Sequence, residues 1–205
     1  MKFPQKKTKL ISNYYKDYVS NLFDSLSLIK FNNLELSHKL IEKTIKNKNN
    51  IFVCGNGGSA SISNHIVCDY LKLLRQKTIL KPKVISFATN LDLISAISND
   101  ISFEDVFAYQ LEALGEKNDL IILISSSGNS PNMIKVLNLA KKKKIKSIAF
   151  TGFDGGFLKS NSDISIHFAS QNYGISEDCH HISMHVIMQF LRQKYLKGNI
   201  KKINF

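Results

Sequence analysis

An unbroken apolar run near the middle of the chain most constrains the fold. After Asp119 the sequence reads Leu-Ile-Ile-Leu-Ile, with no polar residue in alternation. A strand with one face in water alternates apolar and polar residues, so this run predicts a central strand that is covered on both faces. Such strands belong to parallel sheets, whose crossover helices bury both sides of the sheet. The run therefore predicts an α/β fold.

The remaining sequence alternates between short apolar runs and helical periodicity, as a parallel sheet requires. We expect a doubly wound sheet of five parallel strands with helices on both faces, and a single domain over residues 1–205. Two helices, at 11–31 and 34–47 with a break at Asn32-Asn33, form an N-terminal helical extension over 1–48. They cap the domain or build an oligomer interface. The α/β core covers 49–197, with strands at 51–54, 83–87, 119–124, 147–151 and 163–168 and helices at about 59–75, 91–98, 104–115, 131–143 and 176–196.

Composition excludes several classes of function. The formal net charge is +12 at pH 7, but the lysines are scattered and no basic and aromatic residues interleave, so nucleic-acid binding is disfavoured. A basic field can still attract an anionic substrate. There is no apolar stretch long enough for a membrane span and no secretory leader. Three cysteines without a CxxC pair indicate a reducing, cytoplasmic compartment.

A glycine turn follows the first expected strand. The turn reads Gly55-Asn56-Gly57-Gly58 and lies between an apolar run and a helix start, where free backbone N–H groups and the helix dipole favour an anion. The same residues match a relaxed dinucleotide fingerprint. That pattern expects an acidic residue about 20 positions on, and none occurs between Asp69 and Asp92, so NAD is disfavoured while NADP stays open. A glycine turn used only for packing is the remaining alternative.

A second loop of small residues follows the central strand. Residues 125–130 read Ser-Ser-Ser-Gly-Asn-Ser, and Pro131 suits the first turn of the next helix. Simple N-capping needs one serine, whereas four hydroxyls suit phosphate oxygens. Both loops fall at the carboxyl ends of parallel strands, where open α/β sheets bind ligands. We therefore expect the two loops to face one pocket.

Histidines and carboxylates share helix faces in two places. His65 and Asp69 are four residues apart, and Glu177, His181 and His185 are spaced by four on the last helix. Such sets bind Zn²⁺ or another divalent ion, or act as acid and base. The alternative for each is an ordinary helix histidine with a charged helix cap. A dyad of Cys68 with histidine is a weaker hypothesis, because Cys68 lies off the shared face.

The motifs together resemble a known family. GNGGSA at 55–60, SSSGNS at 125–130, TGFDGG at 151–156 and the segment at 99–115 resemble the sugar isomerase (SIS) domain, and within it the phosphoheptose isomerases. The resemblance runs from about residue 11 to 197. It implies that sedoheptulose 7-phosphate is converted through an enediol into D-glycero-D-manno-heptose 7-phosphate, for lipopolysaccharide or capsule heptose. It also implies a cytoplasmic homotetramer with active sites at subunit interfaces, a bound zinc or other divalent metal ion, and no nucleotide cofactor.

The resemblance also implies roles for individual residues. Asp69 falls on the catalytic base and His185 on the catalytic acid, and Asp100 on a further substrate-binding position. The expected metal ligands are His65, Asp69, Glu177 and His185. The expected phosphate-binding residues are Asn56, Gly57, Ser59, Ser125, Ser126, Ser127 and Ser130.

Two residues depart from the family pattern. Asp69 is shorter than the usual glutamate, and Glu177 replaces a neutral glutamine. A charged Glu177 either strengthens metal binding or takes over the role of catalytic base. A non-catalytic SIS module that senses a sugar phosphate is the alternative function. The retained histidines and carboxylates, and the lack of a recognisable DNA-binding domain, favour the isomerase.

Overall fold

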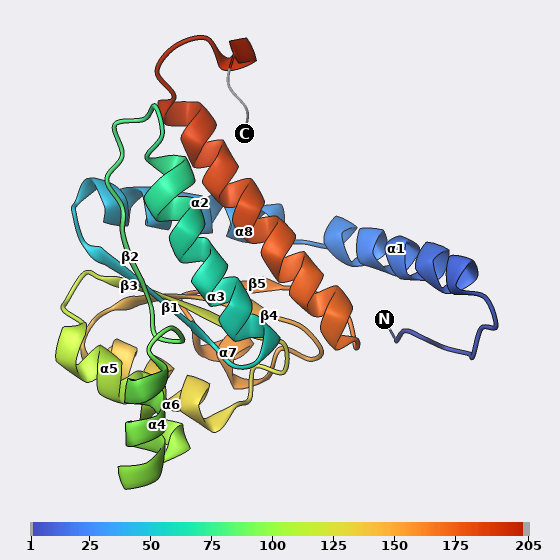
Figure 1. Cartoon of the computed structure of the whole chain (residues 1–205), viewed down its shortest axis with the longest axis horizontal. Coiled ribbons are helices and arrows are strands. Elements are labelled where there is room, and N and C mark those ends of the chain that lie inside the picture. The colour runs from blue at the N-terminus through green and yellow to red at the C-terminus, as the bar shows by residue number, and fades with distance from the viewer. Residues whose placement is uncertain (1, 203–205) are drawn as a thin grey trace.

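The computed structural model describes residues 2–202, which form one parallel five-stranded sheet between two layers of helices (Figure 1). The strand order is β2-β1-β3-β4-β5, and every neighbouring pair is parallel. All six residues of β3 are buried, as its apolar sequence predicts. The strands are β1 (Asn50–Gly55), β2 (Lys83–Ser86), β3 (Leu120–Ser125), β4 (Lys146–Thr151) and β5 (Ile164–His167).

Each face of the sheet carries its own core. Alternate residues of β1 point to opposite faces, so Ile51 and Val53 join one cluster while Phe52 and Cys54 join the other. The first cluster is covered by α2 (Phe31–Lys46), α3 (Gly58–Cys68) and α8 (Tyr173–Tyr195). The second is covered by α4 (Leu91–Asp100), α5 (Val106–Leu114), α6 (Pro131–Lys142) and α7 (Gly156–Asn161). The predicted doubly wound architecture is thus confirmed.

The N-terminal helices have different bounds from those expected. The first, α1, covers Ile11–Ser27, and α2 already begins at Phe31, so Asn32 and Asn33 lie inside a helix rather than breaking one. The helix predicted at 11–31 is therefore confirmed from Ile11 to Ser27, whereas its predicted end and the break at Asn32-Asn33 were wrong. Asn33 finds a tertiary partner that sequence could not show: its side-chain amide donates to the Ser165 carbonyl on β5, 2.7 Å away. This bond fixes the first turn of α2 against the edge of the sheet.

Helix α3 does not end as an α-helix. Its last residue is Cys68, and the chain continues as a π-helical turn over Asp69–Leu74, within the helix expected at 59–75. Wider turns of this kind are frequent at functional sites. Two further short elements were not expected: α7, and a 3₁₀ turn over Phe103–Asp105 that precedes α5. A final 3₁₀ turn covers Ile200–Lys202.

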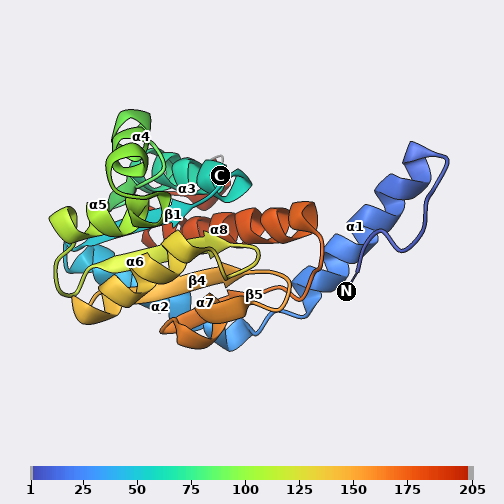
Figure 2. The same ribbon diagram turned by 90° about the horizontal axis from the view of Figure 1, so that it is seen from below.

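Helix α1 projects from the body of the molecule (Figures 1 and 2). Its inner side packs on the N-terminal segment, where the ring of Phe3 lies 5.0 Å from that of Tyr14, and on α8, where the Tyr18 hydroxyl donates to Asp178 at 2.6 Å. Its outer side exposes a stripe of apolar side chains spaced by four residues. The stripe consists of Ile11, Tyr15, Val19 and Phe23. None of the helices within residues 2–202 has the length and apolar character needed to cross a membrane.

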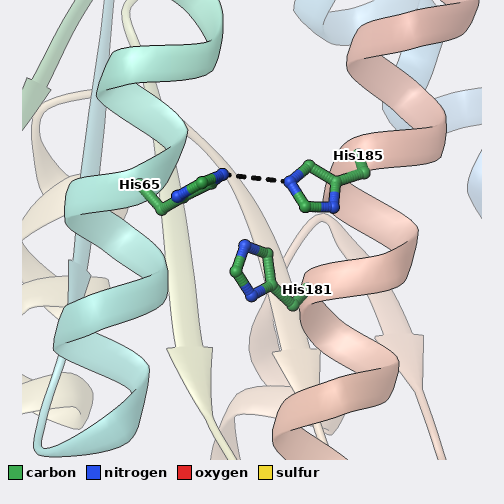
Figure 3. Close-up of side chains that lie close together, drawn as sticks. All are labelled: His65, His181 and His185. Atoms are coloured by element: carbon green, nitrogen blue, oxygen red, sulfur yellow. Dashed lines mark hydrogen bonds between the residues drawn. The ribbon is translucent and has the colours of Figure 1, made fainter. Parts of the chain in front are cut away.

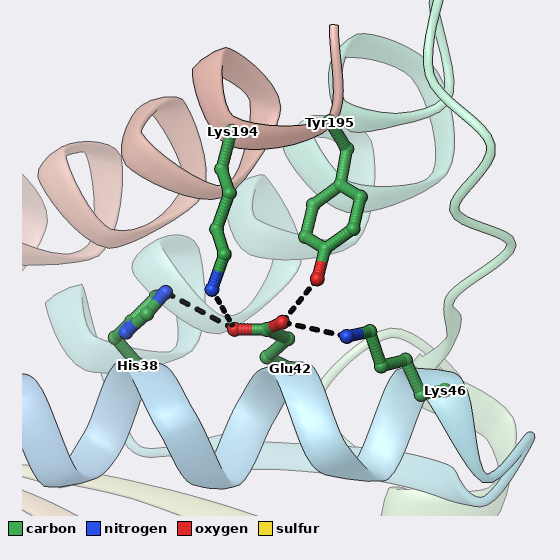
Figure 4. A network of polar contacts seen from close by, with 5 residues as sticks. All are labelled: His38, Glu42, Lys46, Lys194 and Tyr195. Carbon is green, nitrogen blue, oxygen red and sulfur yellow. Dashed lines mark hydrogen bonds and ion pairs between the residues drawn. The ribbon is translucent and has the colours of Figure 1, made fainter.

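A buried carboxylate connects α2 to the C-terminal end of α8 (Figure 4). Glu42 accepts hydrogen bonds from the Lys194 ammonium at 2.7 Å and from the Tyr195 hydroxyl, and it pairs with Lys46 at 2.9 Å. His38 lies 3.4 Å from the same carboxylate. Burial alone raises the pKa of Glu42, but these donors outweigh it and lower the pKa to about 2. The network holds α8 in place from the end opposite to Tyr173.

Candidate active site

The two small-residue loops meet at the carboxyl edge of the sheet. One follows β1 and the other follows β3, and these strands are neighbours in the sheet. After β1 the chain continues to β2 on one side, and after β3 it continues to β4 on the other side. The strand order therefore reverses direction between β1 and β3. This switch point is where doubly wound sheets open a crevice for ligands. The prediction that both loops face one pocket is confirmed.

A polar pocket of about 150 Å³ lies between the loops. Two helices, α3 and α6, begin beside it, and their N-termini favour an anion. Among the described residues that line the pocket none is a lysine or arginine, so hydroxyls and helix dipoles set its polarity. The lining residues are Asn56, Ser59, Ile124, Ser125, Ser126, Ser127, Ser130, Tyr173 and Glu177.

The serine hydroxyls of the second loop are available to a ligand. The hydroxyls of Ser125 and Ser127 accept from the N–H groups of Gly128 and Asn129, and a hydroxyl that accepts keeps its own O–H to donate. The buried hydroxyl of Ser126 has no hydrogen-bond partner within residues 2–202. A buried polar group without a partner is costly, and a phosphate oxygen would satisfy it.

Backbone conformation shapes both loops. Gly57, which precedes α3, has φ +55°, a conformation that glycine adopts without strain. The 151–156 turn supports the other loop, because the Gly152 N–H donates to the Ser126 carbonyl at 2.9 Å and the Asn129 side chain accepts from Phe157 N–H at 2.9 Å. The three glycine-containing motifs therefore form one structural unit around the pocket.

Three histidines converge between α3 and α8 (Figure 3). One ring nitrogen of each of His65, His181 and His185 lies within 4.8 Å of the others. The Nε2 atoms of His65 and His185 are 3.0 Å apart. Burial, followed by the neighbouring imidazoles of His185 and His65, lowers the pKa of His181, which keeps its ring neutral near pH 7.

A buried carboxylate lies against two of these histidines. Asp69 is only 3% exposed, and its two oxygens lie 3.4 Å from His65 Nε2 and 3.3 Å from His185 Nε2. If one neutral ring donates its Nε2 hydrogen to the Nε2 of the other, that hydrogen is used for the contact between the rings, and the accepting nitrogen has no hydrogen to offer the carboxylate. A cation among these atoms removes that conflict. The donor set of imidazoles and a carboxylate is one that Zn²⁺ and related metals prefer.

Comparison with known proteins decides the family. The family model described as "SIS domain" matches residues 14–152. A phosphoheptose isomerase of Helicobacter pylori is 37% identical over 165 residues, which are 79% of this chain and 83% of that protein. One from Buchnera aphidicola is 33% identical over 201 residues, covering 93% of this chain and all of that protein. The chain belongs to the phosphoheptose isomerase family.

A solved structure agrees with this assignment. The phosphoheptose isomerase from Francisella tularensis superposes with a TM-score of 0.81 at 26% identity, and the match covers 91% of this chain and all of that one. The expected SIS-type sheet and the expected class of enzyme, an aldose–ketose isomerase, are therefore confirmed at the level of the family.

Of two further residues that phosphoheptose isomerase motifs indicate, one lies apart from the pocket lining and the other lines it with its amide already engaged. Asp100, the last residue of α4, is exposed and accepts from the Asn99 side chain at 2.8 Å. Asn56 lines the pocket, but its amide is engaged in a reciprocal pair with Asn132 of α6, at 2.9 and 3.0 Å. Each amide satisfies the other, so Asn56 ties the glycine turn to α6.

Glu177 lies at the polar pocket between the two loops rather than among the histidines. Its carboxylate covers the first turn of α3 so closely that a Cβ on Gly58 would lie 2.4 Å from it. Burial, with a further contribution from Asp178, raises the pKa of Glu177 above its ordinary value. It is not a member of the group formed by the histidines. His181, absent from the expected ligand set, occupies the place beside His185 instead.

Proposed function

We propose that this member of the phosphoheptose isomerase family converts sedoheptulose 7-phosphate into D-glycero-D-manno-heptose 7-phosphate, the precursor of heptose in lipopolysaccharide or capsule. The observation that carries the proposal is the junction of two sites along α8. The polar pocket would take the phosphate group, and His181 and His185 follow its lining residue Glu177 along the same helix. The relatives named above support the proposal, since both are named as phosphoheptose isomerases.

The spacing along α8 favours a long sugar. Glu177 lines the pocket, and His181 and His185 follow on the same helix face, about 6 and 12 Å further along the axis at 1.5 Å per residue. A phosphate at one end of a seven-carbon chain would lie in the pocket while C1 and C2 reach the cluster. A three-carbon sugar phosphate is too short to do so.

The reaction moves one proton between neighbouring carbons. Asp69 takes the proton from C1 to give the enediol and returns it to C2, while His185 donates a proton to the C2 oxygen and takes one back from the C1 hydroxyl. Nothing is gained or lost overall, so no redox cofactor or nucleotide is needed. Glu177 is the alternative base, since it lies at the same pocket.

A divalent metal ion, most simply Zn²⁺, belongs to the proposed site. The lone-pair conflict around Asp69 and the orphaned buried Nε2 of His181 both fit a cation. His65, Asp69 and His185 would hold it. When bound there, such an ion would supply Lewis-acid stabilisation of negative charge on the oxygens of the substrate.

We further propose a cytoplasmic homotetramer. The exposed apolar stripe of α1 and exposed Ile182, Val186 and Phe190 on α8 supply faces that a second copy would cover. All three cysteines are free, in agreement with a reducing compartment. Sedimentation equilibrium of the purified protein gives the oligomeric state, and a monomer would refute this part.

Solvent-exchange kinetics test the proposed reaction. The chain should release deuterium from C1-deuterated sedoheptulose 7-phosphate and form the aldose product. Tight binding of this sugar phosphate with neither exchange nor product would refute the isomerase and support the sensing module. His185→Ala should lower the rate by about 10²–10⁴-fold. The matched control is His38→Ala, because His38 lies in the Glu42 network on α2.

A further inference from the structure

His181 is the member of the cluster whose role the motifs leave unassigned. It lies one turn before His185 on α8, and its ring centroid is 4.6 Å from that of His65 and 4.5 Å from that of His185. Figure 3 shows the three rings turned toward a common point between α3 and α8. His181 therefore stands in direct reach of any ion that His65 and His185 hold.

The Nε2 atom of His181 has the environment expected of a metal ligand. Its Nε2 is buried and has no hydrogen-bond partner in the described part of the chain. Leaving a buried nitrogen unsatisfied costs about 1–3 kcal/mol, so such atoms call for an explanation. A metal ion accepts the lone pair of a neutral imidazole and removes this cost.

Glu177 has a different environment, although it shares the helix face. Its carboxylate packs on Gly58 and lines the pocket between the two loops. One helical turn separates it from His181, and it does not join the group of ring nitrogens. A ligand at position 177 and a ligand at position 181 are thus distinct alternatives for the fourth donor.

We propose that His181 is a metal ligand in this chain and that Glu177 is not. The metal centre then has three imidazoles, from His65, His181 and His185, with Asp69 as the carboxylate donor. Glu177 is left to the substrate, at the pocket that takes the phosphate end of the sugar. This inference rests on the metal site of the proposed function, but it can be tested without any sugar.

Zinc affinity separates the two ligand sets. Competition with a chromogenic chelator should show that His181→Gln weakens Zn²⁺ binding at least about tenfold. Glu177→Gln, the matched exchange of a neighbouring polar residue for the same amide, should leave the affinity within about twofold. Circular dichroism of both variants checks that they fold. An unchanged affinity in His181→Gln, or a loss confined to Glu177→Gln, would overturn the proposal.

The unaltered protein supplies a second measurement. X-ray absorption at the zinc edge of the full chain loaded with one equivalent of Zn²⁺ should show three imidazole ligands, whereas two imidazoles would contradict the proposal. Neither measurement uses substrate. Failure of isomerase activity would therefore leave the ligand assignment intact, and failure of the ligand assignment would leave the isomerase intact.

Discussion

Two buried carboxylates contact α8, Glu42 at its C-terminal end and Asp69 near its middle, and their partners differ in kind. Glu42 is surrounded by two ammonium groups and a phenol, which are donors at neutral pH (Figure 4). Asp69 faces the Nε2 atoms of two histidines, which also contact each other at 3.0 Å and are of the kind that binds metal ions. The first carboxylate is held by two ammonium groups and a hydroxyl, and the second lies against two imidazoles that can themselves bind a metal ion.

This difference separates a structural group from a functional one. Satisfied polar networks hold elements together, whereas groups left unsatisfied by the fold mark sites where the protein gives up stability for chemistry. The same helix therefore carries an anchor at one end and reactive groups nearer the other. Substitutions of the two carboxylates should affect different measurements.

The largest expected effect is on catalysis. Asp69→Asn should lower kcat/KM for sedoheptulose 7-phosphate by about 10²–10⁴-fold, because an amide cannot accept the proton from C1. Glu42→Gln should keep kcat/KM within about twofold of the unaltered value. Coupled steady-state assays of the two variants measure this contrast. Equal losses in both variants would remove the distinction between the two carboxylates.

Metal binding should stabilise the fold through contacts at Asp69 and not at Glu42. Zn²⁺ at about 100 times its Kd should add about 2.7 kcal/mol, or roughly 5–10 °C in Tm for a chain of this size. Glu42→Gln should show the full shift, and Asp69→Asn a smaller one. Differential scanning calorimetry with and without a chelator gives the values. An identical shift in both variants would place the metal elsewhere.

The free energy of unfolding should depend on Glu42. Glu42→Gln should lower the free energy of unfolding by about 1–3 kcal/mol, because it breaks a buried ionic network. The loss should stay below the largest values known for broken buried ion pairs. Lys46 and Lys194 are about half exposed, so water can solvate their ammonium groups in the variant. Urea unfolding measures the loss. Glu35→Gln, an exposed residue on the same helix, is the control and should change stability by less than about 0.5 kcal/mol.

The contribution of the Glu42 network to stability should be lost at low pH. The pKa of Glu42 is lowered from 4.5 to about 2, so its carboxylate contributes stability that is complete above about pH 4.5 and is lost as pH falls toward 2. The unaltered protein should therefore lose more stability than Glu42→Gln over that window. Urea unfolding at a series of pH values compares the slopes. Parallel slopes would show that Glu42 does not titrate below its ordinary range.

Sequence predicted the sheet well because its signals are local. The apolar run after Asp119, the glycine turn at 55–58 and the serine loop at 125–130 each depend on neighbouring residues, and the structure confirms the elements that they indicate. The start of α2 was misplaced because the stabilising partner of Asn33 is a carbonyl on β5, more than a hundred residues away. Propensity rules cannot include such a contact.

The candidate site was predictable only in part, because local spacing shows which residues share a helix face but not which other helix they meet. Spacing placed Glu177, His181 and His185 on one face of the last helix, but it cannot tell which of them faces α3. The family pattern favoured Glu177, whereas the packing of α3 on α8 brings His181 to His65. The signal that could have found His181 was its spacing of four residues from His185.

Deuterium exchange at C1 of sedoheptulose 7-phosphate in D₂O tests the central claim most directly. The unaltered protein and Glu42→Gln should incorporate solvent deuterium at the same rate, and Asp69→Asn should do so at least about a hundredfold more slowly. Incorporation by Asp69→Asn at the unaltered rate, or by none of the three proteins, would contradict the assignment of Asp69 as the base of a sugar-phosphate isomerase.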